Sequence, residues 1–367
     1  MDGRERFLTV LSNQKPDRMP VQVHGWMSFY LQHYLDGADQ YAAYEAVGMD
    51  PVIYVQPDQV FQESDLQNWE IRRQRGPDGR EHNGFQYTTT ITTPKGVLVE
   101  KGGGNDITSW VTKHLIEDER DFALWDEFVP LPTLDWAPVL AAKERIGRHG
   151  IVRSGCYGFG QGSPWQDLST VLMGTERTIF KAMDEPDWVH FVLGRLLDKK
   201  LQVYERSGPI ELDLVETGGG GGSSTVISPA MHKEFCLPYD QKQHKLMHEL
   251  GAKVVYHLCG GLMPLLDIVV ENGADGLETM TPASMGGDCD MALADKKIGD
   301  RMFFIGGFDQ NAGFEHGTVE NVYAQVQQLF QAKQHGGYIC CPSDHFFFGD
   351  PSLIRAFADA ARECVYS

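Results

Sequence analysis

Short apolar runs recur along the chain, and most of them end in glycine, an acid or histidine before a helical pattern begins. Near-continuous apolar strands separated by helices are typical of a parallel sheet that is buried on both faces. We expect strands at Pro20–His24, Pro51–Val55, Gly150–Ser154, Leu212–Glu216, Lys253–Leu258, Ala274–Glu278, Met302–Gly306 and Gly337–Cys341. The clearest helices are expected at Ser228–Leu250, Leu262–Asn272, Val319–His335 and Pro351–Cys364.

Eight such strands in alternation with helices predict an α/β fold, a (β/α)₈ barrel of the TIM type. A doubly wound open sheet is the alternative, but no glycine-rich dinucleotide fingerprint follows the first strand. An unusually long interval separates the second and third strands, and within it Gly84–Val99 has the pattern of a β-hairpin around Pro94-Lys95-Gly96. Because no linker or shift in composition marks a boundary, we expect one domain over residues 1–367 with an insertion at about 58–148.

Composition excludes several classes of partner. The 367 residues include 32 basic and 51 acidic side chains, a net charge of −19, which argues against nucleic acid and anionic membranes. No apolar run approaches a membrane span, and no signal-peptide core follows Met1, so we expect a cytoplasmic protein. The seven cysteines are an odd number scattered along the chain, which favours reduced thiols over a disulfide framework.

The strand at Lys253–Leu258 leads into a pair of metal-binding side chains. His257 and Cys259 are two residues apart, so they project from the same side of the strand. Imidazole and thiolate are ligands that zinc prefers, and Glu278 ends the next strand at the same rim. Other polar side chains also stand at strand ends, namely His24, Glu216, Asp309 and the Cys340–His345 turn. The sequence therefore predicts a zinc site that includes His257, Cys259 and Glu278.

The last ligand is expected from the final strand. Adjacent Cys340 and Cys341 must face opposite sides, so at most one of them should bind, and we favour Cys341 because it is nearer the strand end. Cys340, Asp344 and His345 stay open as alternatives, as does the reading of the cysteine pair as two buried thiols. His24, Asp309 and His345 are candidates for catalytic proton transfer.

Five consecutive glycines, Gly218–Gly222, follow the fourth expected strand. They are no phosphate loop, because no lysine followed by serine or threonine comes after them. They form either a flexible turn or a stretch of backbone, with Gly219, Gly220 and Gly221 at its centre, that lets a bulky ligand or cofactor come close.

Several segments resemble the uroporphyrinogen decarboxylase superfamily. They are Arg4–Phe7, Lys15–Val21, Tyr256–Gly261, Gly306–Asp309 and Gly337–Ile339, and the similarity extends over most of the chain. That superfamily has a (β/α)₈ barrel. The His257-x-Cys259 pair is similar to the corrinoid-linked zinc methyltransferases, and the order of His257, Cys259, Glu278 and a later cysteine is similar to the zinc site of cobalamin-independent methionine synthase. The decarboxylases carry an Arg-Gln-Ala-Gly-Arg segment near the N-terminus, whereas this chain has Val23–Met27 without arginine.

One departure bears on the direction of methyl transfer. The thiol methyltransferases place their last cysteine two residues after the proline of the final turn, where this chain has Asp344. Fewer sulfur ligands would make a harder, more Lewis-acidic centre that suits methyl donors with oxygen leaving groups. The resemblance therefore implies transfer from a small methylated donor, favouring a methoxylated aromatic, to the Co(I) corrinoid of a partner protein.

Three other functions stay open. They are a methylcobamide:thiol (coenzyme M type) methyltransferase, a decarboxylase like uroporphyrinogen decarboxylase, and a non-catalytic protein that binds a corrinoid or a metal. The resemblance also implies a possible homodimer, because the superfamily commonly forms one.

Overall fold

The computed structural model describes residues 1–77, 84–160 and 162–367, which fall into two compact units. The first comprises Met1–Gln56, Trp136–Cys156 and Pro209–Ser367, and the second comprises Pro57–Asp135 and Tyr157–Gly208. The prediction of a single domain stays a prediction. Part of the expected insertion, residues 78–83, lies outside the described residues.

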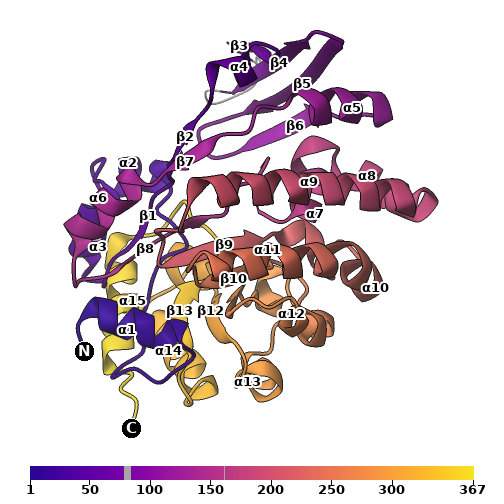
Figure 1. Ribbon diagram of the computed structural model, residues 1–367. Coiled ribbons are helices and arrows are strands. Elements are labelled where there is room, and N and C mark those ends of the chain that lie inside the picture. The colour runs from indigo at the N-terminus through magenta and orange to yellow at the C-terminus, as the bar shows by residue number, and fades with distance from the viewer. Residues whose placement is uncertain (78–83, 161) are drawn as a thin grey trace. The chain divides into compact units, whose positions relative to one another are not determined.

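The first unit is built on a parallel sheet of seven strands (Figure 1). Their order is that of the chain: β1 (Val52–Tyr54), β8 (Ile151–Gly155), β9 (Leu214–Gly218), β10 (Val254–His257), β11 (Gly276–Thr279), β12 (Phe303–Phe308) and β13 (Tyr338–Pro342). Seven of the eight expected strands are thus present, and the sheet curls as in a TIM-like barrel, which confirms the predicted fold class. The strands are almost wholly buried, as expected for a parallel sheet covered on both faces.

The Pro20–His24 segment forms no full strand. It pairs with β13 through one isolated bridge, Val21 to Cys340, held by hydrogen bonds from Gln22 N to Cys340 O (3.1 Å) and from Cys340 N to Pro20 O (3.0 Å). Among the described residues, no ladder joins this segment to β1, which is an edge of the sheet. We call this break in the hydrogen-bonded wall the seam.

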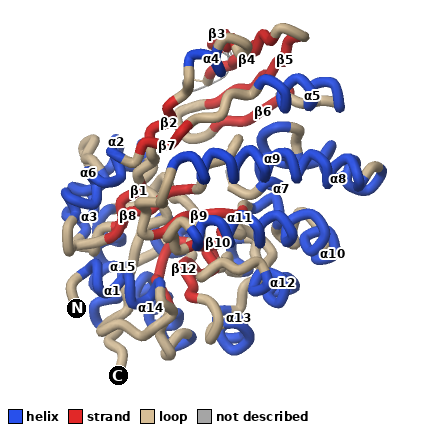
Figure 2. Tube along the Cα trace, in the orientation of Figure 1, coloured by secondary structure: helices blue, strands red, loops and turns tan. Residues whose placement is uncertain are grey.

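Helices of the first unit lie outside the strands (Figure 2). They are α1 (Gly3–Leu11), α2 (Ser28–Tyr34), α3 (Gln40–Val47), α6 (Ala137–Ile146), α10 (Pro229–Met231), α11 (Leu237–Glu249), α12 (Leu266–Glu271), α13 (Met291–Ile298), α14 (Val319–Ala332) and α15 (Pro351–Glu363). Short helical turns are η2 (Gly220–Gly222), η4 (Met263–Leu265) and η5 (Ala283–Met285), and π-helical turns are η3 (His232–Cys236) and η6 (Asn311–Glu315). Ser228 caps α10 by accepting from Met231 N (3.2 Å), and Pro229 opens the helix.

Buried polar side chains fasten α11 to the sheet. His244 hydrogen-bonds through Nδ1 to the carbonyl of Asn272 (2.8 Å) and through Nε2 to Thr217 Oγ1 (2.8 Å). Tyr256 donates to Asp240 Oδ2 (2.7 Å). Burial lowers the pKa of His244 to about 4, so this imidazole is neutral at neutral pH.

The second unit contains an antiparallel sheet, drawn in purple in Figure 1. Its strands are β3 (Glu70–Pro77), β4 (Phe85–Thr93), β5 (Gly96–Gly104) and β6 (Ser109–Lys113), and β4 and β5 form the expected hairpin around Pro94 and Lys95. The other elements are β2 (Asp58–Val60), β7 (Thr133–Asp135), α4 (Glu63–Leu66), α5 (Glu119–Phe128), α7 (Pro164–Gln166), π-helical η1 (Asp167–Leu172), α8 (Thr175–Asp184) and α9 (Pro186–Ser207).

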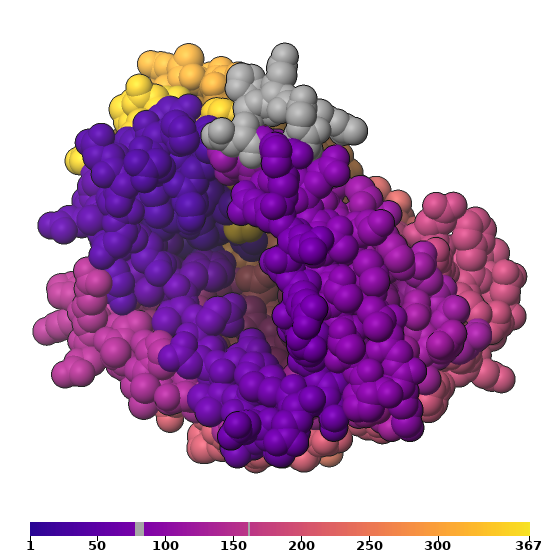
Figure 3. Space-filling view, turned by 90° about the horizontal axis from the view of Figure 1, so that it is seen from above, coloured from indigo at the N-terminus to yellow at the C-terminus, as the bar shows by residue number. Residues whose placement is uncertain are grey.

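The two ends of the chain meet in the first unit. Arg18 forms a β-bridge with Val365, and Met19 N donates to Cys364 O (2.9 Å). On another face of the molecule, Figure 3 shows residues from the first part of the chain, in indigo, next to residues from its last part, in yellow. Helices of the described part of the chain are all too short or too polar to cross a membrane.

Candidate metal centre

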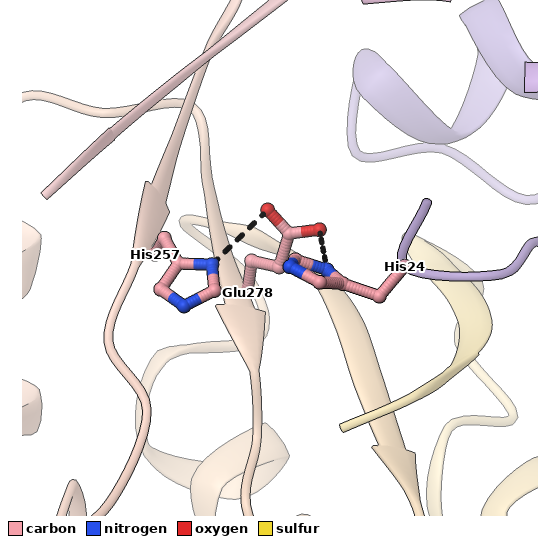
Figure 4. A group of neighbouring side chains, drawn as sticks. All are labelled: His24, His257 and Glu278. Atoms are coloured by element: carbon pink, nitrogen blue, oxygen red, sulfur yellow. Dashed lines mark hydrogen bonds and ion pairs between the residues drawn. The ribbon is translucent and has the colours of Figure 1, made fainter. Parts of the chain in front are cut away.

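Three predicted side chains converge at the carboxyl ends of the strands of the first unit. His257 ends β10 and is paired in register with Glu278 of β11, while His24 comes from the Pro20–His24 segment. Their ligand atoms lie within 4.8 Å of one another, and the carboxylate of Glu278 stands between the two imidazoles (Figure 4). The side chains of His24, His257 and Glu278 are only 5%, 14% and 1% exposed.

A fully buried arginine holds this group together. Arg153 of β8 donates to both oxygens of Glu278, at 2.8 and 2.6 Å, and to Glu216 Oε2 of β9 at 2.8 Å. Each carboxylate also faces an imidazole. His24 Nδ1 lies 3.2 Å from Glu278 Oε1, and His257 Nδ1 lies 3.3 Å from Glu216 Oε1. The sequence predicts Glu216 only as a strand-end residue, and it does not predict Arg153 as part of the site.

The electrostatics of this group favour an added positive charge. Burial opposes ionisation of Glu278, but the charges of Arg153 and His24 outweigh it and hold the pKa of this carboxyl well below 4.5. Burial on its own would lower the pKa of His24, yet the charge of Glu278 raises it above 6.5. For His257, the Cys259 thiol and the charge of Glu216 outweigh burial and also raise the pKa. The neighbouring carboxylates thus raise the pKa of both buried imidazoles.

Backbone strain follows Glu278 directly. Thr279 and Met280 are both buried and have φ of 84° and 47°, in the left-handed region that glycine normally occupies. For the β-branched Thr279 this conformation is unfavourable, and such strain persists only where the surroundings enforce it. Thr279 Oγ1 donates to Leu258 O (3.0 Å), which ties the strained residue to the end of β10.

The predicted cysteine ligands lie outside the His24–His257–Glu278 group. Cys259 is half-buried beside His257, and the Gly218–Gly222 run packs against it, since a Cβ added at Gly220 would lie 2.5 Å from its Sγ. Cys341 is buried on the same face as Glu278 and Arg153, whose charges affect its pKa, whereas Cys340 lies near Cys364. Zinc binding by Cys259 and Cys341, and the role of Gly219, Gly220 and Gly221 towards a ligand, stay predictions.

The remaining predicted residues are placed differently. The carboxylate of Asp309 accepts from Ser284 Oγ (2.6 Å) and from Ala312 N (2.9 Å) and is not part of the group around His24. His345 lies beside His24, with ring centroids 4.7 Å apart. His24, Asp344 and His345 form a second group whose ligand atoms lie within 4.8 Å of one another. Their catalytic roles stay predictions.

The side chains of the buried group fit a divalent metal ion. Two nitrogens and a carboxylate oxygen are a donor set that zinc accepts. Two carboxylates against the single guanidinium of Arg153 leave a net charge of −1 when both imidazoles are neutral. Among the described residues, His257 Nδ1 is buried without a hydrogen-bond partner, although it lies 3.3 Å from Glu216 Oε1. The group can therefore hold a metal ion.

Comparison with known proteins identifies the family. The profile described as "Uroporphyrinogen decarboxylase (URO-D)" matches residues 102–364, and the chain belongs to this family. Over 97% of the chain and 96% of the relative, it is 22% identical to a uroporphyrinogen decarboxylase of Synechocystis. It is also 22% identical to a methylated-thiol–coenzyme M methyltransferase of Methanosarcina mazei, over 52% of the chain and only 49% of that relative.

A solved structure shares the fold. A methyltransferase from Methanosarcina mazei superimposes with a TM-score of 0.65 over 98% of both chains, at 15% sequence identity. The chain is thus a URO-D-like enzyme with a TIM-like barrel.

Proposed function

We propose that this chain is a zinc-dependent methyltransferase that moves a methyl group from a small methylated donor to the Co(I) corrinoid of a partner protein. The observation that carries the proposal is the buried group of His24, His257 and Glu278 at the carboxyl ends of the barrel strands, where barrel enzymes have their active sites. The family membership and the distant likeness to a methyltransferase support it.

In this proposal His24, His257 and Glu278 hold the zinc ion, with Cys259 beside them. Bound zinc supplies Lewis acidity to the heteroatom from which the methyl group departs. Arg153 fixes both oxygens of Glu278, and Glu216 faces His257, so the ligands are oriented before substrate arrives. His345, next to His24, stands where it can pass a proton to a leaving oxygen.

The donor set favours an oxygen leaving group, and hence a methoxylated aromatic as methyl donor. The three closest ligands offer nitrogen and oxygen without sulfur, which makes a hard Lewis acid. The second candidate is the methylcobamide:thiol methyltransferase. It is favoured by the thiol of Cys259 beside His257, since an added thiolate ligand makes the centre softer.

Decarboxylation of a poly-acid substrate is less well supported. Arg153 is buried, and Glu278 and Glu216 already neutralise it, so its guanidinium is not free to bind substrate carboxylates. The Val23–Met27 stretch carries no arginine either.

Metal analysis and turnover test the proposal. The purified protein should contain one zinc per chain, and His257→Ala should lower zinc affinity at least ~100-fold because it removes a direct ligand. His316→Gln, an exposed histidine elsewhere in the first unit, is the matched control. Stoichiometric zinc retained by a His257→Ala/Cys259→Ser double variant would overturn the site.

Turnover separates the candidates. Anaerobic mixing with a Co(I) corrinoid protein and methoxylated aromatics should give methyl-Co(III), followed by absorbance. Methyl transfer from methylcobamide to thiols, without reaction of the aromatics, would favour the thiol enzyme. Binding without either reaction would favour a non-catalytic protein.

A further inference from the structure

The two groups of possible metal ligands share one residue. His24 belongs to the buried group with His257 and Glu278 and to the second group with Asp344 and His345. Its ring neighbours both other imidazoles, with centroids 5.0 Å from His257 and 4.7 Å from His345. Each group offers two imidazoles and one carboxylate.

The groups differ in their access to water. His24 and Glu278 are buried, whereas Asp344 and His345 are exposed. A hydrated metal ion that enters a buried site exchanges its water ligands for protein ligands, and it needs an entry path. An exposed group of ligands that shares His24 with the buried group can bind the ion first and then release it to the buried ligands.

The outer residues are held in place by the barrel. Ser343 N donates to Phe308 O (2.9 Å), and Gly307 N donates to Ser343 Oγ (3.2 Å). The carbonyl of His345 accepts from Gln310 Nε2 (3.3 Å), and Gln310 is itself buried. The turn that carries Asp344 and His345 is therefore anchored to β12 and η6.

We propose that His24, Asp344 and His345 form an outer site that captures a divalent metal ion and passes it to the buried site. His24 keeps contact with the ion while Asp344 and His345 are exchanged for His257 and Glu278. The inference rests on the proposed metal centre and adds the route by which the metal arrives and leaves.

The test follows Co²⁺ binding to metal-free protein by stopped-flow absorbance, and Co²⁺ release to EDTA. In Asp344→Asn/His345→Gln, we expect both rates to fall by about tenfold with an unchanged dissociation constant, because a site on the path lowers the barrier in both directions. His345→Gln alone leaves the charge of a neutral imidazole unchanged, so slower binding there cannot come from weaker long-range attraction. Asp300→Asn/His316→Gln, at exposed positions, makes the same changes elsewhere and should leave both rates as they are.

The outcomes are distinct. Unchanged rates in the outer double variant overturn the outer site. A weaker dissociation constant with an unchanged binding rate also overturns it, because Asp344 or His345 would then be a ligand of the final site. Failure of the parent protein to take up Co²⁺ or Zn²⁺ stoichiometrically would instead refute the proposed metal centre. In His257→Ala/Cys259→Ser, the outer site predicts that a fast, weak phase of Co²⁺ binding remains.

Discussion

Replacing Arg153 with methionine removes the guanidinium that donates to both oxygens of Glu278 and to Glu216. Methionine has a similar length and no charge, so Glu278 is left buried beside a second carboxylate. Such a group avoids the cost of an uncompensated charge by taking up a proton.

The magnitude follows from the proton. The ordinary pKa of this carboxyl is 4.5, which is 2.5 units below pH 7, so protonating it at pH 7 costs about 3.4 kcal/mol. The lost hydrogen bonds add to this, so we expect Arg153→Met to lower the free energy of unfolding by ~3–5 kcal/mol at pH 7, as for other broken buried ion pairs.

The loss should depend on pH. In the parent protein the low pKa of Glu278 contributes stability that is present above pH 4.5 and is lost as the pH falls through its folded value. At pH 7 Glu278 of the variant is protonated in the folded state and ionised in the unfolded state, so lowering the pH towards 4.5 stabilises the variant. The part of the stability loss that comes from protonating Glu278 should therefore shrink to less than ~1 kcal/mol at pH 5.

Urea unfolding of EDTA-dialysed protein, followed by circular dichroism at pH 7 and pH 5, measures this difference. Arg4→Met is the matched control, because Arg4 also grips a carboxylate with two hydrogen bonds, to Asp213 at 2.9 and 2.6 Å, but its side chain is 30% exposed. There we expect a loss of about 1 kcal/mol. A loss below ~1 kcal/mol at pH 7 for Arg153→Met, or one of equal size at both pH values, refutes the reasoning.

Two further predictions concern His244 and Gly220. Because the pKa of His244 is lowered to about 4, the parent protein should lose about 3 kcal/mol between pH 6.5 and pH 4 through this residue. In urea unfolding, the difference in free energy of unfolding between the parent protein and His244→Gln should narrow by the same amount over this pH range. A constant difference would contradict a neutral, buried His244. Gly220→Ala should displace Cys259 and change its rate of labelling by a thiol reagent, since the added Cβ would lie 2.5 Å from Sγ. Gly222→Ala, whose Cβ meets nothing closer than 3.5 Å, is the control, and equal effects in both variants would contradict the contact.

Much of the fold could be predicted from the chain because apolar strands alternate with helices. Seven expected strands are present within a few residues of their predicted ends. The eighth is reduced to one bridge, because Pro20 has no N–H to donate and Gly25, with φ of 78°, turns the chain away. The assignment of Tyr157–Gly208 to the second unit was not foreseen, since its helices follow the barrel pattern in sequence.

The site was only partly predictable. His24, His257 and Glu278 stand where apolar strands end, so their position alone marks them. Arg153 lies inside a strand, and only the register of β8 beside β9 and the interior of the barrel bring it to Glu278. Its one signal was a charged side chain in an otherwise apolar strand, which needs a buried counter-charge.

The seam gives the barrel wall uneven stiffness. A closed ring of backbone hydrogen bonds resists widening evenly, but no ladder joins β1 to the Pro20–His24 segment in the described structure. His24 belongs to the Pro20–His24 segment at this break, while His257 and Glu278 lie on the paired strands β10 and β11. An ion bound by all three would cross-link the Pro20–His24 segment to β10 and β11, between residues more than 200 positions apart in the chain. Metal occupancy would then set how far the barrel mouth can flex.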